Sequence, residues 1–266
     1  MNKSISILGS GWLGFPLAKQ LTSEFEKVNI STRSEEKSKL LEGVGLRPFI
    51  IDMQNLKKNI QSFLQTDTLI INVTGKDINA FKNLISEIEK SPVKEVLFIS
   101  STSVYPEHSG LCRESRPLDI SSHPLLEIEA LFQQNTHFKS TILRFSGLIG
   151  GKRHPGRFFA TGKSIRLAEA GVNLIHLDDC LAIIAIIVKQ HVFPELLNCC
   201  ADTHPRKVDF YTANALALGL PKPQISSENR QSNKIVSNEK LKKRLNYQFI
   251  HGDLMQLDAR KDYDLN

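Results

Sequence analysis

Three glycines near the start of the chain have the spacing of a dinucleotide-binding turn. Gly9, Gly11 and Gly14 form a G-x-G-x-x-G pattern directly after an apolar run over residues 4–8, and the pattern opens a helix-like segment. In that context the first glycine permits a tight turn, the second lets backbone N–H groups approach a pyrophosphate, and the third lets helix and strand pack closely. The positive end of the helix then faces the negative charge of the ligand. The turn residues expected to contact a dinucleotide are Gly9, Ser10, Gly11, Trp12, Leu13 and Gly14.

The end of the second strand-like run, residues 28–32, indicates which dinucleotide binds. NAD sites usually carry an acidic residue at this point, where it binds the ribose 2′-hydroxyl. This chain has Thr32, Arg33 and Ser34 instead. These residues lack a carboxylate and offer a guanidinium and hydroxyls to a 2′-phosphate. We therefore predict NADP in preference to NAD, while a solvated loop arginine is the plainer interpretation of Arg33.

Three further residues lie at or just after the ends of later strand-like runs. Asp52 follows the third run, and two interpretations stay open for it: a partner for the adenine amino group, or a cap for the strand end. Thr74 and Ser100, after the fourth run and at the end of the fifth, are the remaining cofactor contacts that we expect. Residues at the carboxyl ends of parallel strands suit this task because ligands of open α/β sheets bind there.

Strand-like and helix-like segments alternate through the first two-thirds of the chain, which is typical of a parallel sheet with right-handed crossovers. We predict an α/β fold, a doubly wound parallel Rossmann sheet with a smaller C-terminal substrate domain. The predicted Rossmann domain comprises residues 1–148 with 172–203, and the substrate domain comprises 149–171 with 204–266. The predicted strands are residues 4–8, 28–32, 46–52, 68–73, 96–100, 140–145 and 196–200. The main predicted helices are residues 13–25, 78–89, 125–134, 178–190, 212–218 and 239–245, with a loop over 147–162.

Composition limits the possible partners and compartments. The 266 residues carry a net charge of +6, of which residues 1–150 contribute 17 cationic and 16 acidic side chains and residues 151–266 contribute 17 and 12. The basic helix over 239–245 has neither aromatic interleaving nor a nucleic-acid-reading motif, so we expect no nucleic-acid partner. The longest apolar run, residues 181–188, is too short to span a bilayer, and we expect no membrane partner. Four cysteines without metal-type or disulfide-type spacing favour the reducing cytoplasm.

Several segments resemble the extended short-chain dehydrogenases, the NAD(P)-dependent epimerase/dehydratase family. Residues 97–105, LFISSTSVY, are similar to the family's S-S-x-x-V-Y segment, and residues 172–179, VNLIHLDD, are similar to its N-x-I-H-V-D-D segment. Together with the glycine turn and residues 234–238, KIVSN, the resemblance covers nearly the whole chain. Residues 151–159, GKRHPGRFF, look like those of a small bacterial branch that is similar to nucleotide-sugar epimerases.

The resemblance implies a catalytic serine or threonine and a Y-x-x-x-K dyad. Ser101 takes the first position, and Thr102 and Ser103 stand as substrate contacts where dehydratases carry acidic residues. The dyad is missing: the register places Ser122 at the tyrosine and Leu126 at the lysine. None of the four tyrosines has a lysine four residues on. The candidate replacements as acid or base are Tyr105, His123 and His154, each with a plainer interpretation as packing, helix start or anion site.

A glycine-rich loop carries several cations and is expected to face an anionic substrate, as the resemblance implies. Its cations suit a phosphate or carboxylate, although a solvated basic loop is the alternative interpretation. The expected substrate contacts are Arg153, His154, Arg157 and Asn173. We expect an NADP-dependent oxidoreductase or epimerase-like enzyme, monomeric or homodimeric, acting on an anionic small molecule such as a nucleotide-sugar. The alternative is a catalytically silent NADPH-binding sensor.

Overall fold

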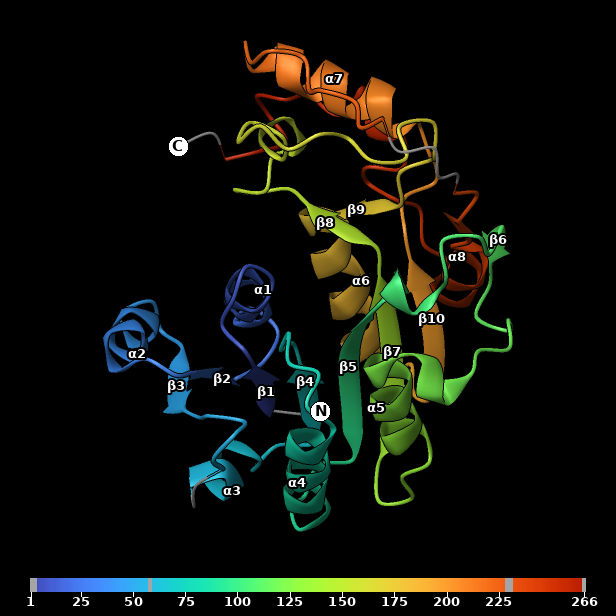
Figure 1. Cartoon of the computed structure of the whole chain (residues 1–266). Helices are drawn as coiled ribbons and strands as arrows, with labels where there is room; N and C mark the ends of the chain where they lie inside the picture. The colour runs from blue at the N-terminus through green and yellow to red at the C-terminus, as the bar shows by residue number, and fades with distance from the viewer. Residues whose placement is uncertain (1–3, 57–58, 228–231, 265–266) are drawn as a thin grey trace. The chain divides into compact units, whose positions relative to one another are not determined.

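The computed structural model describes residues 4–56, 59–227 and 232–264. Its strands alternate with helices along most of the chain (Figure 1). The strands are β1 Ser4–Leu8, β2 Lys27–Thr32, β3 Arg47–Ile50, β4 Thr68–Ile71, β5 Glu95–Ser101, β6 Leu111–Cys112, β7 Lys139–Phe145, β8 Gly147–Ile149, β9 Leu174–His176, β10 Glu195–Cys199 and β11 Ile235–Val236. The α-helices are α1 Gly14–Leu21, α2 Glu35–Glu42, α3 Asn59–Phe63, α4 Ile78–Glu89, α5 Pro124–Gln133, α6 Leu177–Gln190, α7 Lys207–Ala217 and α8 Glu239–Leu245.

The main sheet has seven strands in the order β10-β7-β5-β4-β1-β2-β3. β1 pairs in parallel with both β2 and β4, and the chain continues outward from these to β3 and β5, also in parallel. The strand order therefore reverses between β1 and β4, the switch point at which open α/β sheets bind ligands. The predicted fold class, a doubly wound parallel Rossmann sheet, is confirmed.

Helices lie on both sides of this sheet. Figure 1 shows α1 and α2 on one side of β1–β3 and α4 on the other. Phe81 of α4 and Phe132 of α5 pack on Phe98 of β5, with ring centroids 5.5 Å and 4.9 Å from it. All three side chains are at most 1% exposed, so the strand that carries Ser100 and Ser101 is held on a rigid aromatic core.

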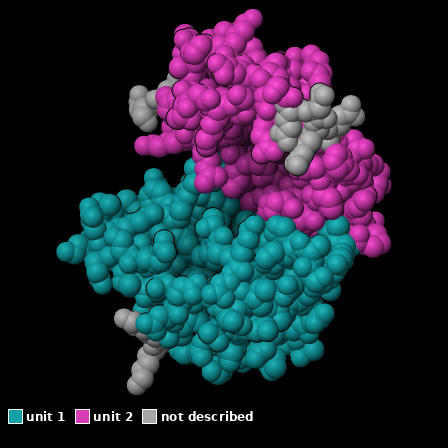
Figure 2. Space-filling model, in the orientation of Figure 1, with its two compact units in different colours: residues 1–100, 118–143, 184–196 teal, residues 101–117, 144–183, 197–266 magenta. Residues whose placement is uncertain are grey.

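The chain forms two compact units (Figure 2). Unit 1 holds residues 1–100, 118–143 and 184–196, and unit 2 holds residues 101–117, 144–183 and 197–266. The predicted division, 1–148 with 172–203 against 149–171 with 204–266, follows the main sheet rather than these units, and it stays a prediction.

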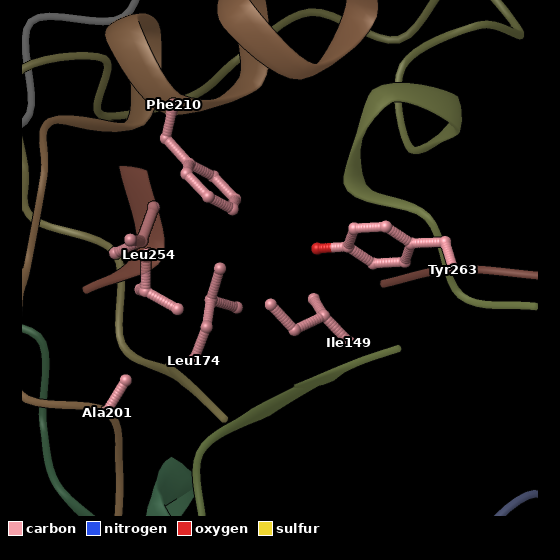
Figure 3. Close-up of a cluster of buried hydrophobic side chains, with 7 residues drawn as sticks. Ile149, Leu174, Ala201, Phe210, Leu254 and Tyr263 are labelled. Atoms are coloured by element: carbon pink, nitrogen blue, oxygen red, sulfur yellow. The ribbon is translucent and has the colours of Figure 1, made fainter. Parts of the chain in front are cut away.

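Unit 2 has its own hydrophobic core (Figure 3). This core gathers side chains from β8, β9, α7 and the C-terminal segment: Ile149, Val172, Leu174, Ala201, Phe210, Leu254 and Tyr263. Two short parallel pairs, β8–β9 and β6–β11, complete the unit's β-structure. Figure 3 shows the Tyr263 hydroxyl pointing in among the apolar side chains.

Unit 2 is also where the predicted elements depart furthest from the structure. The segment 147–162, predicted as a loop, contains β8. This strand is formed by its pairing with β9, a segment more than 20 residues away in the sequence, so its own residues do not indicate it. Helix α7 begins at Lys207 rather than at residue 212. Helix α6 begins at Leu177 rather than at residue 178, so Asp178 and Asp179 both lie in its first turn. Within residues 4–56, 59–227 and 232–264, no helix has the length and apolar character that a bilayer crossing requires.

Candidate functional site

A cleft of about 550 Å³ opens in unit 1 at the carboxyl ends of β1, β2 and β4. Its position coincides with the switch point of the sheet, where the expected ligand is a dinucleotide. Eight of the residues predicted to bind cofactor line it: Gly9, Ser10, Gly11, Thr32, Arg33, Ser34, Asp52 and Thr74.

The three glycines of the turn differ in what surrounds them. Gly9 has φ +110°, and a Cβ there would lie 2.3 Å from the Asn72 carbonyl oxygen. A Cβ at Gly14 would lie 1.9 Å from the Gly9 carbonyl oxygen, whereas a Cβ at Gly11 would meet no atom within 4 Å. The turn is thus closely packed at its first and third glycines and open at its second. This open space is where a diphosphate would approach the backbone, so the residues fit a dinucleotide.

Hydrogen bonds hold the turn against the neighbouring strand and helix. The Gly9 N–H donates to Ser31 Oγ on β2 at 2.8 Å. The Lys37 ammonium of α2 donates to the Ser10 carbonyl oxygen at 2.5 Å. The turn, the end of β2 and the start of α2 therefore form one connected wall of the cleft.

The start of α2 gathers groups that bind anions. Ser34 caps the helix, with its Oγ accepting from the Lys37 N–H at 3.2 Å, and Thr32 Oγ1 accepts from the Ser34 N–H at 3.3 Å. Each hydroxyl acts here as an acceptor, so its own proton stays available for an anion. Arg33 lines the cleft and is exposed. Together with Lys37 it makes this corner cationic.

The other predicted cofactor residues have local partners. Asp52 Oδ1 accepts from the Gln54 N–H at 3.0 Å, a turn contact that leaves its second oxygen available. The buried Ser100 hydroxyl donates to Glu129 of α5 at 2.5 Å. The cleft lining does not include Trp12, Leu13, Gly14 or Ser100, and direct cofactor contacts by these four residues stay predictions.

Two of the residues predicted for catalysis, Ser101 at the end of β5 and Tyr105 shortly after it, lie in unit 2. Ser101 Oγ accepts from the Ser103 N–H at 3.1 Å, which leaves the hydroxyl proton free to donate to a substrate oxygen. Thr102 is buried and Ser103 is exposed.

Tyr105 is enclosed within unit 2. Its hydroxyl accepts from Arg144 Nη1 at 2.8 Å and donates to Asn198 Oδ1 at 2.9 Å, and the residue is 1% exposed. Burial raises the pKa of Tyr105 despite the adjacent guanidinium. This geometry favours the packing interpretation, and an acid/base role for Tyr105 stays an untested prediction.

The cationic loop presents two exposed arginines, Arg153 and Arg157, and one buried histidine. His154 Nδ1 accepts from the Gly156 N–H at 2.9 Å. Burial lowers the pKa of His154, so its imidazole is neutral near pH 7 and acts as a local cap. Asn173 uses both ends of its amide on the backbone near β11, donating to the Lys234 carbonyl and accepting from the Val236 N–H. Substrate contacts by these four residues stay predictions.

Comparisons with known proteins agree with this architecture. The Escherichia coli protein YeeZ is 29% identical, over 94% of this chain and 97% of its own. A structure from Methylobacillus flagellatus, described as a candidate NAD-dependent epimerase/dehydratase, is 29% identical with a TM-score of 0.74 over 94% of both chains. UDP-glucuronic acid 4-epimerase from Bacillus cereus, solved with NAD, is 16% identical with a TM-score of 0.75 over 98% of this chain and 97% of its own. No protein-family model matches the sequence.

The chain therefore has the fold of the NAD-dependent epimerase/dehydratase and short-chain dehydrogenase/reductase proteins that are similar to it. The resemblance inferred from the sequence is confirmed at the level of the fold.

The two residues predicted to stand at the dyad positions have local structural contacts. The Ser122 hydroxyl is exposed and donates to the Asp119 carbonyl at 2.6 Å, and Leu126 is 5% exposed in the apolar face of α5. His123 caps this helix, with Nδ1 accepting from the Leu125 N–H at 3.1 Å. Burial and the charge of Lys76 lower the pKa of His123. Because Nδ1 accepts, Nε2 carries the proton of the neutral ring, so His123 caps the helix with one nitrogen and can donate a hydrogen bond with the other.

Two of the lining residues that sequence reasoning missed contact the glycine turn. Lys37 lies in the predicted cationic corner, three residues after Ser34, and its charge at the start of a helix-like segment is a signal that could have found it. Asn72, which packs against Gly9, follows β4 in an otherwise apolar run and carried no recognisable signal.

Proposed function

We propose that this protein is an NADP-dependent oxidoreductase or epimerase-like enzyme acting on an anionic small molecule. The observation that carries the cofactor part is the cleft of unit 1, in which an open glycine turn adjoins a corner with two cations. When bound, the cofactor supplies hydride transfer at its nicotinamide ring.

The preference for NADP rests on Arg33 and Lys37. Arg33 is exposed in the cleft lining, and Lys37 reaches the Ser10 carbonyl from one helical turn away. A guanidinium and an ammonium complement the two negative charges of a 2′-phosphate. The first turn of α2 also carries the exposed carboxylates Glu35 and Glu36, which weaken the helix N-terminus as an anion site. Any preference for NADP over NAD must therefore come from the Arg33 and Lys37 side chains rather than from the dipole of α2.

Arg33→Asp is expected to weaken NADPH binding about 10- to 100-fold while NADH binding stays equal or improves, because a charge-assisted contact is worth about 1.5–3 kcal/mol. Titration of each nucleotide into the purified protein measures both affinities. Lys39→Ala is the matched control, since Lys39 is exposed on the same helix and lies outside the cleft lining. An unchanged ratio of NADPH affinity to NADH affinity in Arg33→Asp would contradict the assignment of NADP as the cofactor.

The substrate part of the proposal rests on hydroxyl and cationic groups of unit 2. The Ser101 hydroxyl is free to donate to a substrate carbonyl or hydroxyl, and the exposed Arg153 and Arg157 can bind a phosphate or carboxylate. A nucleotide-linked sugar carries both kinds of group.

One observation favours a catalytically silent NADPH sensor instead: at the positions of the missing dyad, Ser122 is bonded locally and Leu126 is buried. Nicotinamide oxidation or reduction over a panel of carbonyl and hydroxyl substrates, including anionic sugars, separates the two functions. The enzyme proposal expects turnover that falls at least 100-fold in Ser101→Ala with NADPH affinity unchanged. Tight NADPH binding without turnover on any substrate would favour the sensor.

A further inference from the structure

Three polar side chains from two distant segments of unit 2 converge near the end of β9. His176 is the last residue of β9, Asp178 lies in the first turn of α6, and His251 follows α8. One nitrogen or oxygen of each lies within 4.8 Å of the other two. Nothing in the proposed function uses these residues.

The ligand types and distances suit a transition metal. Asp178 Oδ2 lies 3.3 Å from His176 Nδ1 and 2.9 Å from His251 Nε2. In a tetrahedral zinc site with bonds of about 2.0–2.1 Å, neighbouring ligand atoms are roughly 3.3 Å apart. Two imidazoles with one carboxylate form a donor set that zinc and similar metals use when one position stays open to water.

Surrounding contacts orient the first histidine for metal binding. His176 is 2% exposed, and its Nε2 lies 2.8 Å from the Asp262 carbonyl oxygen. Because a carbonyl can only accept, Nε2 carries a proton, and in the neutral ring the Nδ1 lone pair faces Asp178. Metal-binding histidines usually have such a backbone or carboxylate partner on their other nitrogen. The Asp178 N–H contacts the same Nδ1 at 3.3 Å, a long hydrogen bond that a metal would replace.

The segment that carries His251 is fixed independently of these ligands. The carboxylate of Asp179 is fully buried and accepts from the Ile250 N–H at 2.7 Å and from the His251 N–H at 3.1 Å. The His251 ring packs on that of His176, with centroids 4.0 Å apart. The Asp178 side chain is 53% exposed, whereas that of His251 is 14% exposed, so water and ions can reach the cluster from the Asp178 side.

We propose that His176, Asp178 and His251 bind one divalent transition-metal ion of the zinc class, with water in the fourth position. The ion would fasten the segment around His251 to the junction of β9 and α6. This site lies within unit 2 and is independent of the proposed cofactor and substrate.

Metal titration of the full chain, freed of metal with a chelator, tests the proposal. Zn²⁺ should bind with one equivalent by calorimetry, and Co²⁺ should give the visible absorption bands of a four-coordinate nitrogen–oxygen site. At a free zinc concentration 100 times Kd, the melting temperature should rise by roughly 5–10 °C. His251→Gln should weaken Zn²⁺ at least 100-fold. Asp178→Asn should also weaken it, and because Asp178 is half exposed this variant remains informative if His251→Gln fails to fold.

His191→Gln is the matched control, because His191 also contacts a carboxylate, that of Glu95 at 2.9 Å, but belongs to no cluster of three such ligands within the described residues. This variant should bind Zn²⁺ as the unaltered protein does. The proposal is overturned if no saturable one-equivalent binding occurs, or if folded Asp178→Asn and His251→Gln bind Zn²⁺ with unchanged affinity.

Discussion

Gly14→Ala is expected to lower the free energy of unfolding by about 3 kcal/mol, since overpacking at a rigid contact costs this much. The new Cβ would lie 1.9 Å from the Gly9 carbonyl oxygen, which belongs to the backbone and cannot rotate away. Alanine has the higher helix propensity by about 1 kcal/mol, so the steric conflict decides the sign of the effect. Urea unfolding followed by the fluorescence of Trp12, the single tryptophan, measures it close to the altered turn.

Gly11→Ala is the matched control for this prediction. Its Cβ would meet no atom within 4 Å, so the free energy of unfolding should change by less than about 1 kcal/mol. Equal stability losses in the two variants would contradict the packing that the structure assigns to the turn.

Asp179→Ala is expected to cost about 3–5 kcal/mol of stability, because it removes a buried charge and leaves its donors unpaired. The carboxylate is 0% exposed and accepts from the Tyr247 hydroxyl at 2.7 Å as well as from the Ile250 and His251 N–H groups. Urea unfolding followed by far-ultraviolet circular dichroism gives the loss.

Asp209→Ala provides the comparison, since Asp209 also lies in the first turn of a helix but is half exposed and bonded to Arg206. Loss of the Asp209–Arg206 ion pair should lower the free energy of unfolding by less than about 1 kcal/mol, as for other surface ion pairs. An Asp179→Ala variant as stable as Asp209→Ala would show that Asp179 does not hold the segment after α8.

The sheet could be predicted from the sequence because its signals are local. Strand β1, the glycine turn and α4 are each indicated by a signal within a dozen residues. These signals are an apolar run, the glycine spacing and helical periodicity, respectively. Helix α4 was predicted with its observed bounds, Ile78–Glu89, and β1 likewise as Ser4–Leu8. The cleft followed from the order of these elements, since strand ends beside a reversal of strand order meet at one place.

Unit 2 could be predicted less well because its structure depends on distant partners. Strand β8 is three residues long and exists through its pairing with β9, and β6 through its pairing with β11. Asp179 lies in the first turn of α6, but its oxygens accept from a segment some 70 residues further on. His176 and His251 are 75 residues apart, so neither suggested a shared site. Such contacts carry no periodic signal in a single sequence.

Titration of NADPH into the intact protein tests the central claim most directly. Energy transfer from Trp12, which lies in the glycine turn itself, reports binding at this site. We predict saturable one-to-one binding in the unaltered protein and its loss in Gly11→Val, whose side chain would enter the open space at the turn, where an added Cβ meets no atom within 4 Å. Absence of saturable binding by the unaltered protein, or the same affinity in Gly11→Val, would contradict a dinucleotide site in this cleft.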